Sequence, residues 1–182
     1  LYYLLAERMP SHKDPRRLDA YKRGIEIYKR GLICRKEPVE FIEVPFGKHK
    51  LPALFSKAPV PGRAPCVVHF DGLDVTKEII YAAVADEFRR RGISLLIVDH
   101  PGVGAALRLL GLPSGPDTEK PAGASVDYLE TRTDVDPKHI GIMALSLGGY
   151  YAPRAAAFEK RFACAVAWGA IFDYHACVSD RI

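Results

Sequence analysis

One serine in this sequence is surrounded by the residue types that a catalytic nucleophile needs. Ser146 follows a short apolar run at residues 140–145, and small residues stand two places before it and two places after it, Ala144 and Gly148. Small side chains at these places let a strand and a helix approach each other around a strained turn that carries the hydroxyl at its apex. Such a hydroxyl can attack a carbonyl carbon if a base removes its proton. A serine that simply caps a crossover helix would give a similar local pattern.

Backbone N–H groups near this serine could stabilise the negative charge that develops on an attacked carbonyl oxygen. Leu147 directly follows Ser146 at the expected start of a helix, where N–H groups lack a partner within the helix. A second donor is expected from residues 71–78, which have the pattern of a glycine turn between a strand and a helix. We predict that Leu73 supplies this N–H group and that Gly72, which allows the turn, is also a candidate substrate contact.

Two polar side chains follow expected strand ends and are candidate substrate contacts. Asp74 would face the same cleft and could bind or polarise a substrate, although a turn or capping role fits its position equally well. His100 lies in a short loop rich in glycine and proline, at residues 99–104. A base is one role for His100, but we favour a role in shaping the pocket floor or packing in the loop.

Strand and helix patterns should bring these residues together at one edge of a sheet. Strands are expected at residues 66–70, 94–98, 140–145 and 162–168, and helices at residues 78–91, 122–131 and 151–160. Continuous apolar strands separated by helices indicate a mostly parallel sheet with helices on both faces. Ligand sites in such sheets lie beyond the carboxyl ends of the strands. The fold class predicted for this part of the chain is therefore α/β.

The first part of the chain has a different pattern. Residues 1–37 are helical in pattern, and Gly31 is the expected C-terminal stop of a helix whose apolar face carries Tyr21, Ile25 and Tyr28. Pro38 marks a break, so we predict a helical segment at residues 1–38 and a core at residues 39–182.

The core is expected to begin with a hairpin. Residues 41–46 and 50–55 alternate in the manner of two strands, and Gly47-Lys48 would join them. Both strands contain a proline, which suggests positions near an edge of the sheet.

Composition narrows the classes of function. The chain has 182 residues and a net charge of +4, and its basic clusters fall on helical patterns, so no nucleic-acid partner is expected. No apolar run approaches the roughly 20 residues that cross a bilayer, so no membrane partner is expected. No metal-ligand spacing or phosphate-binding loop is present, and we predict no cofactor. The four cysteines form no C-x-x-C pair, which fits a cytoplasmic protein, and Cys66 and Cys164 are expected in the core.

Three segments together resemble a known family. They are Asp-Gly-Leu-Asp-Val-Thr-Lys-Glu at 71–78, Asp-His-Pro-Gly-Val-Gly at 99–104 and Ala-Leu-Ser-Leu-Gly-Gly at 144–149. This combination is similar to α/β-hydrolases of the fermentation-respiration-switch-like group, whose relatives include 2,6-dihydroxypseudooxynicotine hydrolases and fungal polyketide-shortening hydrolases. The resemblance covers most of the chain and implies an α/β-hydrolase fold, preceded by the end of a helical cap.

The resemblance also implies roles for individual residues. Ser146 would be the nucleophile, Leu73 and Leu147 the oxyanion donors, and Asp74 an acidic substrate contact where relatives often carry glutamate. Several members of the group cleave a carbon–carbon bond beside a ketone, and others are esterases. We therefore expect a serine hydrolase that acts on a small-molecule ester or ketone through an acyl-enzyme.

The triad of such a hydrolase runs Ser, then Asp or Glu, then His along the chain. The usual acid and histidine would follow later strands, so we expect the sequence to be the N-terminal part of a longer hydrolase, incomplete at its C-terminus. Asp173 is an alternative acid, because some lipases take their acid from this place, and His175 is too close to it in the chain to be its partner. The remaining histidines are interpreted as structural or exposed: His12, His49, His69 and His139.

Two further expectations concern assembly and class. A sheet without its last strands should expose an apolar edge, so a homodimer or aggregation is expected. The alternative from a different class is a non-catalytic binding or regulatory protein on a hydrolase scaffold, since a fold does not determine a function.

Overall fold

The computed structural model describes residues 1–11 and 13–179, and the chain divides into two compact units, Leu1–Val39 and Glu40–Ile182. His12, for which a structural or exposed role was predicted, lies outside the described residues.

The first unit is a pair of helices, α1 (Tyr2–Ala6) and α2 (Arg16–Cys34). They pack closely at Gly24 of α2, where a β-carbon would lie 3.0 Å from Leu4 Cδ2 and 3.1 Å from Tyr3 Cβ. The absence of a side chain at Gly24 therefore allows the short helix to approach the long one.

The predicted helix stop at Gly31 is wrong, because α2 continues to Cys34. Leu32 is buried and continues the apolar face. Burying a leucine contributes about 1.5–3 kcal/mol, which exceeds the cost of about 1 kcal/mol for a glycine inside a helix. The chain leaves the helix at Lys36, which has φ 53°, and the Glu37 N–H donates to the Leu32 carbonyl at 3.0 Å. A hydrogen bond from the second residue after a helix back to a carbonyl of its last turn, with a positive φ in between, is typical of a helix C-terminus.

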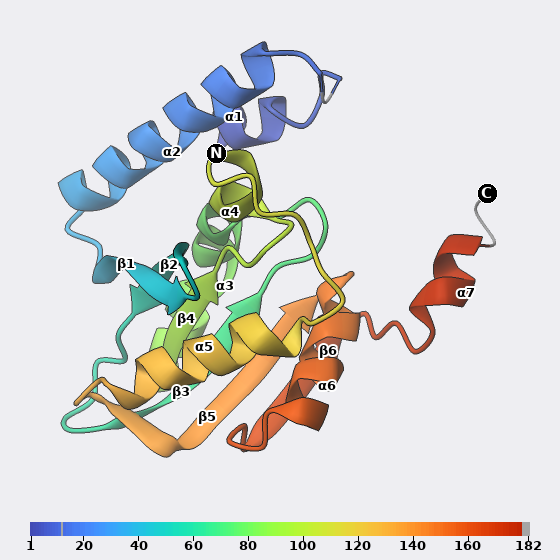
Figure 1. Ribbon diagram of the computed structural model, residues 1–182. Helices are drawn as coiled ribbons and strands as arrows, with labels where there is room; N and C mark the ends of the chain where they lie inside the picture. Colours follow the sequence, from blue (N-terminus) through green and yellow to red (C-terminus); the bar gives the residue numbers. More distant parts are fainter. Residues whose placement is uncertain (12, 180–182) are drawn as a thin grey trace. The chain divides into compact units, whose positions relative to one another are not determined.

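The second unit contains a sheet of six strands in the order β1-β2-β4-β3-β5-β6 (Figure 1). The strands are β1 (Val39–Phe46), β2 (His49–Ser56), β3 (Ala64–Phe70), β4 (Ser94–Val98), β5 (Val135–Leu145) and β6 (Cys164–Trp168). Strands β4, β3, β5 and β6 pair in parallel, whereas β2 pairs antiparallel to β4. The predicted mostly parallel sheet is confirmed, and the hairpin turns at Gly47-Lys48 with β1 at the sheet edge.

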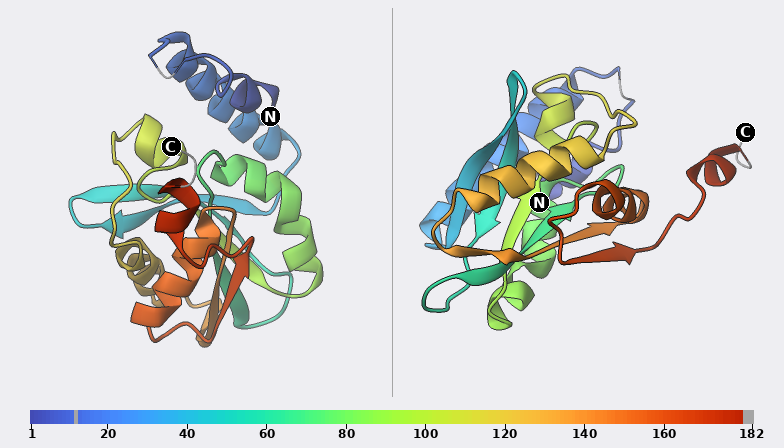
Figure 2. Two further views of the ribbon diagram at one scale, coloured as in Figure 1. Left: turned by 90° about the vertical axis from the view of Figure 1, so that its right-hand side faces the viewer. Right: turned by 60° about the horizontal axis from the view of Figure 1, so that its bottom comes forward.

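Helices cover both faces of this sheet. Helix α3 (Lys77–Arg90) lies on one face, and α5 (Glu119–Glu130) and α6 (Gly148–Phe158) lie on the other (Figure 2). The chain steps from β3 to β4 in one direction and from β4 back past β3 to β5 in the other. Because crossovers are right-handed, this reversal places the helices on opposite faces. Two short helices complete the unit, α4 (Gly104–Arg108) and α7 (Tyr174–Ser179).

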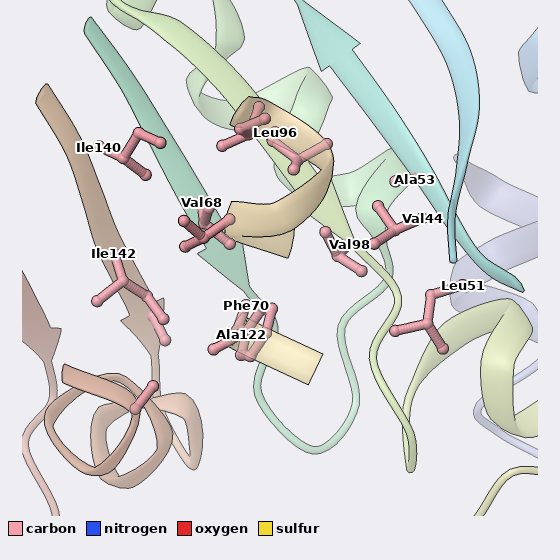
Figure 3. Packing of buried hydrophobic residues seen from close by; sticks show 14 of the residues in the cluster. Val44, Leu51, Ala53, Val68, Phe70, Leu96, Val98, Ala122, Ile140 and Ile142 are labelled. Carbon is pink, nitrogen blue, oxygen red and sulfur yellow. The ribbon is translucent and has the colours of Figure 1, made fainter. Parts of the chain in front are cut away.

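The core contains side chains of the sheet and of α5 and α6, which cover one of its faces (Figure 3). The central strands are apolar along their length, since each is covered on both faces. Their fully buried side chains include Val68, Phe70, Leu96, Val98 and Ile140. This packing fixes where β3, β4 and β5 end, and with them the loops that carry the candidate site.

The two cysteines that were expected in the core differ. Cys66 is buried in β3, and burial raises the pKa of its thiol. The prediction is wrong for Cys164, which is exposed in β6. Strand β6 is the last strand on its side of the described sheet, and the side chains of Val166 and Trp168 on it are also about half exposed.

None of the helices in the described residues has both the length and the hydropathy to cross a bilayer.

Candidate active site

The turn between β5 and α6 holds Ser146 in a strained conformation. Its φ is 61°, in the left-handed region that a serine rarely occupies, and the residue is exposed. The Ser146 N–H donates to the Trp168 carbonyl at 2.9 Å, and the Gly149 N–H donates to the Ser146 carbonyl at 2.7 Å. These bonds from β6 and from the first turn of α6 hold the backbone in a position that presents the hydroxyl outward.

Small residues around the turn are required by sterics. A β-carbon on Gly148 would lie 2.6 Å from Ala144 Cβ, and one on Gly149 would lie 2.4 Å from the Gly169 carbonyl oxygen. Real β-carbons do not approach other atoms this closely. The glycine at 148 therefore lets β5 and α6 meet, and the glycine at 149 lets α6 approach the backbone after β6. The alanine at 144 fits for the same reason, since Gly148 leaves room for its methyl group.

The glycine turn after β3 lies directly beside the serine. A β-carbon on Gly72 would lie 2.8 Å from the Leu145 carbonyl oxygen and 3.4 Å from Ser146 Oγ. Leu73 follows in an exposed position, with 62% of its side chain accessible. Leu147 is the N-cap residue of α6, and its N–H precedes the first intrahelical bonds. The structure thus brings Gly72 close to Ser146, which Leu147 follows in the chain, and Leu73 directly follows Gly72.

The two candidate substrate contacts differ in exposure. Asp74 is exposed in the turn before α3. His100 is buried, and its ring packs at 4.8 Å from the ring of Phe70 and at 5.1 Å, edge to face, from that of Tyr151. Burial lowers the pKa of His100.

His100 also borders a pocket of about 190 Å³. Phe46 from the hairpin lines one part of it, and residues from the segment 113–121 supply much of the rest. The polar residues of this segment in the lining are Ser114, Asp117, Thr118 and Lys120. The Ser114 hydroxyl lies 3.3 Å from the Tyr151 hydroxyl, which links the pocket wall to α6.

A buried ionic cluster lies behind the turn and was not predicted. The Lys77 ammonium lies 2.8 Å from Asp99 Oδ2 and 2.7 Å from Glu78 Oε1, and all three side chains are buried. Asp99 also accepts the Lys77 N–H at 2.9 Å and the Ala105 N–H at 2.8 Å. Burial alone would lower the pKa of Lys77, but the two carboxylates raise it instead. Asp99 therefore ties the start of α3 and the start of α4 to the end of β4.

A second buried pair adjoins this cluster. His69 Nδ1 lies 3.6 Å from Asp71 Oδ1, and neither side chain has a hydrogen-bond partner among the described residues. Burial lowers the pKa of His69 to about 4. Burial and the nearby carboxylates of Asp99 and Glu78 raise the pKa of Asp71 well above its usual range. The sequence signal for both groups was a set of charged residues at the ends of neighbouring parallel strands, which share one edge of a sheet.

The other candidate residues lie apart from this arrangement. Asp173 Oδ1 accepts the Ala176 N–H at 3.0 Å, as a cap on α7. His139 is exposed and lies 2.7 Å from Asp136 Oδ2, and His49 begins β2 in a half-buried position. In residues 1–11 and 13–179, no group of three or more His, Cys, Asp or Glu side chains is arranged to hold a metal ion.

Comparison with known proteins identifies the class. No protein-family model matches the chain. It is 32% identical over 173 residues to the hydrolase ORFZ of Pyricularia oryzae, covering 89% of this chain and 41% of that protein. It is 31% identical over 194 residues to the α/β-hydrolase ucsC of an Acremonium species, covering 96% of this chain and 39% of the relative. The chain thus spans about two fifths of the length of these curated relatives.

A solved structure matches the fold. The crystal structure of 2,6-dihydroxy-pseudo-oxynicotine hydrolase superimposes with a TM-score of 0.82 at 28% identity, over 94% of this chain and 48% of the other. The chain has the α/β-hydrolase fold, as its sheet order, its strand–serine–helix turn and this structural match agree. It is similar to curated proteins named as α/β-hydrolases and to 2,6-dihydroxy-pseudo-oxynicotine hydrolase.

Proposed function

We propose that the protein is a serine hydrolase that cleaves a small carbonyl compound through an acyl-enzyme, with Ser146 as its nucleophile. The observation that carries this proposal is the strained, exposed Ser146 between β5 and α6, with Gly72 in contact with its side chain. Strain of this kind costs about 1–3 kcal/mol and persists where the surrounding structure imposes it. A helix cap does not need it, whereas a nucleophile at the end of a strand does.

The N–H groups of Leu73 and Leu147 are the proposed oxyanion donors. Leu147 offers its N–H at the start of α6, where the helix dipole also favours negative charge. Leu73 follows Gly72, the residue that contacts Ser146. Two donors placed on either side of the hydroxyl would hold the oxygen of a carbonyl that the hydroxyl attacks.

The reaction also needs a base. In the part of the chain that the structure describes, no histidine is hydrogen-bonded to Ser146 Oγ, and His100 and His69 are buried in other contacts. We propose that residues outside this part supply the histidine and the acid of the triad in the whole protein. The histidine would take the Ser146 proton as the C–O bond forms and return it to the leaving group.

Two substrate classes fit this site. With an ester, the tetrahedral intermediate expels an alkoxide, which takes the proton from the histidine and leaves as an alcohol. With a β-diketone or aryl ketone, the carbon–carbon bond breaks, and the leaving carbanion is stabilised as an enolate or phenol tautomer before it is protonated. Water then cleaves the acyl-enzyme in both cases. The similarity to 2,6-dihydroxy-pseudo-oxynicotine hydrolase supports the second class.

The test is labelling of the whole protein with a fluorophosphonate, followed by intact-mass spectrometry. We expect a single adduct that is lost in Ser146→Ala and retained in Ser11→Ala, an exposed serine of the helical unit. An adduct that persists in Ser146→Ala, or no adduct on the wild-type protein, would contradict the proposal and favour a non-catalytic binding role. Hydrolysis of a p-nitrophenyl ester but not of a β-diketone would exclude the carbon–carbon reaction.

A further inference from the structure

The side chain of His100 connects two backbone carbonyls. Its Nε2 lies 3.1 Å from the carbonyl oxygen of Asp71, and its Nδ1 lies 3.0 Å from that of Pro101. Asp71 directly precedes Gly72, so the first contact reaches the turn that lies beside Ser146. The same Asp71 oxygen faces α6, at 3.3 Å from the place where Gly148 would carry a β-carbon.

These two contacts compete for one proton. A carbonyl oxygen only accepts hydrogen bonds, and a neutral imidazole carries a single N–H. Burial lowers the pKa of His100, so the neutral ring is the relevant form near neutral pH. Phe70 and Tyr151 pack against the ring, with one ring nitrogen near each carbonyl oxygen, and a single N–H can serve only one of the two acceptors. One of the two carbonyls therefore receives the hydrogen bond from His100.

We propose that His100 carries its proton on Nε2, donates it to the Asp71 carbonyl and thereby positions the Gly72–Leu73 turn beside Ser146. His100 is then a positioning residue and does not touch the substrate. The Asp71 oxygen lies in a buried place, where an acceptor without a donor is costly. The bond also fixes the carbonyl one residue before the turn that presents the Leu73 N–H. This inference rests on the proposed function for its effect on rate, but not for the bond itself.

Two substitutions separate the two contacts. In His100→Gln the amide nitrogen occupies the place of Nε2 and can still donate to Asp71, whereas in His100→Asn it occupies the place of Nδ1 and reaches only Pro101. We expect His100→Asn to lower kcat for ester hydrolysis about tenfold or more with little change in KM, since misplaced oxyanion donors act on the transition state. His100→Gln should stay within about threefold of the wild-type kcat. The matched control is His139→Asn, at an exposed histidine.

A second measurement does not depend on catalysis. Amide hydrogen exchange at Gly72 and Leu73 should be faster in His100→Asn and unchanged in His100→Gln. If the wild-type protein proves inactive, the proposed function fails, and this exchange still decides whether His100 holds the turn. Equal kcat and equal exchange in the two variants would overturn the proposal.

A third measurement uses the wild-type protein, in case a variant does not fold. The ¹⁵N chemical shifts of the His100 ring in histidine-labelled protein report which nitrogen is protonated. We expect the Nε2–H tautomer. The Nδ1–H tautomer would contradict the proposal, because the ring would then donate its hydrogen bond to the Pro101 carbonyl and not to that of Asp71.

Discussion

The α-carbon of Gly72 faces Ser146 so closely that a β-carbon on residue 72 would lie 3.0 Å from Ser146 Cβ. The turn after β3 and the turn after β5 are therefore in van der Waals contact at the carboxyl edge of the sheet. β3 and β5 are neighbours in the sheet, and Phe70 pairs with Ala144 near their ends. The contact between the two turns is a direct consequence of this register.

Substitution of Gly72 should damage the site more than the fold. A β-carbon there would approach the Leu145 carbonyl oxygen to 2.8 Å, so either the turn or the serine must move. For Gly72→Ala we expect a loss of about 10²-fold in the fluorophosphonate labelling rate of the whole protein. Gly31→Ala, where a β-carbon meets no atom within 4 Å, should label at the wild-type rate. A Gly72→Ala variant with wild-type reactivity would show that this contact does not position the site.

Substitution of Gly148 should lower stability. A β-carbon on Gly148 would lie 2.6 Å from Ala144 Cβ, between a central strand and its covering helix. We expect Gly148→Ala to reduce the free energy of unfolding by about 1–3 kcal/mol, as other overpacked cores do. In urea titrations, Gly31→Ala should instead be neutral or stabilising by up to about 1 kcal/mol, because alanine favours the helix. Equal midpoints for the two variants would refute the steric argument.

Removal of the Lys77 ammonium should be far more costly than removal of an exposed one. Lys77→Met leaves the buried carboxylates of Asp99 and Glu78 without their cation. We expect a loss of about 3–5 kcal/mol in the free energy of unfolding. The comparison is Lys50→Met, which breaks an exposed pair with Glu43 and should cost less than about 1 kcal/mol. A loss at Lys77 no larger than the loss at Lys50 would mean that the cluster is hydrated.

The stability of the protein should depend on pH through His69. Its pKa is lowered to about 4 in the folded protein and returns to about 6.5 on unfolding, so between these values the unfolded chain binds more protons. Stability should thus be full above about pH 6.5 and fall as pH drops toward 4, by on the order of 3 kcal/mol from this group. Asp71, with its raised pKa, acts in the opposite sense.

The contribution of His69 is isolated by the difference between wild type and His69→Gln. Chemical unfolding of both proteins should show that the stability of the wild type falls relative to that of His69→Gln as the pH drops across this range, because only in the wild type does unfolding expose an imidazole that takes up a proton there. A constant difference between the two curves would show that His69 does not titrate in this window.

Much of the fold could be predicted because it depends on local pattern. The apolar runs at β3, β4 and β5 and the amphipathic face of α3 are visible in the sequence, and each element was expected at its observed place. The start of β5 was missed, because the strand begins at Val135 and not at residue 140. The continuation of α2 past Gly31 could not be predicted from local pattern, because the burial of Leu32 outweighs the cost of a glycine in the helix. The exposure of Cys164 depends on what covers β6, which an apolar run does not reveal.

The candidate site also has a part that local sequence pattern predicts and a part that depends on tertiary contacts. The serine turn has a local steric signature, so Ser146 and its small neighbours could be found from spacing alone. The cluster around Lys77 could not be found from spacing alone. Asp99 becomes the partner of Lys77 only through the pairing of β3 with β4. Nor could the two carbonyl contacts of His100 be predicted, since hydrogen bonds between a side chain and a distant backbone leave no periodic trace.

The chain contains a single tryptophan, and its backbone carbonyl is the acceptor for the Ser146 N–H. The indole of Trp168 is about half exposed, so its emission should respond to changes in polarity nearby. Native fluorescence can therefore follow the serine turn without an added dye. In the 182-residue chain, a ligand that engages Ser146, or a substitution that loosens the turn, should be recorded as a change in the emission of Trp168.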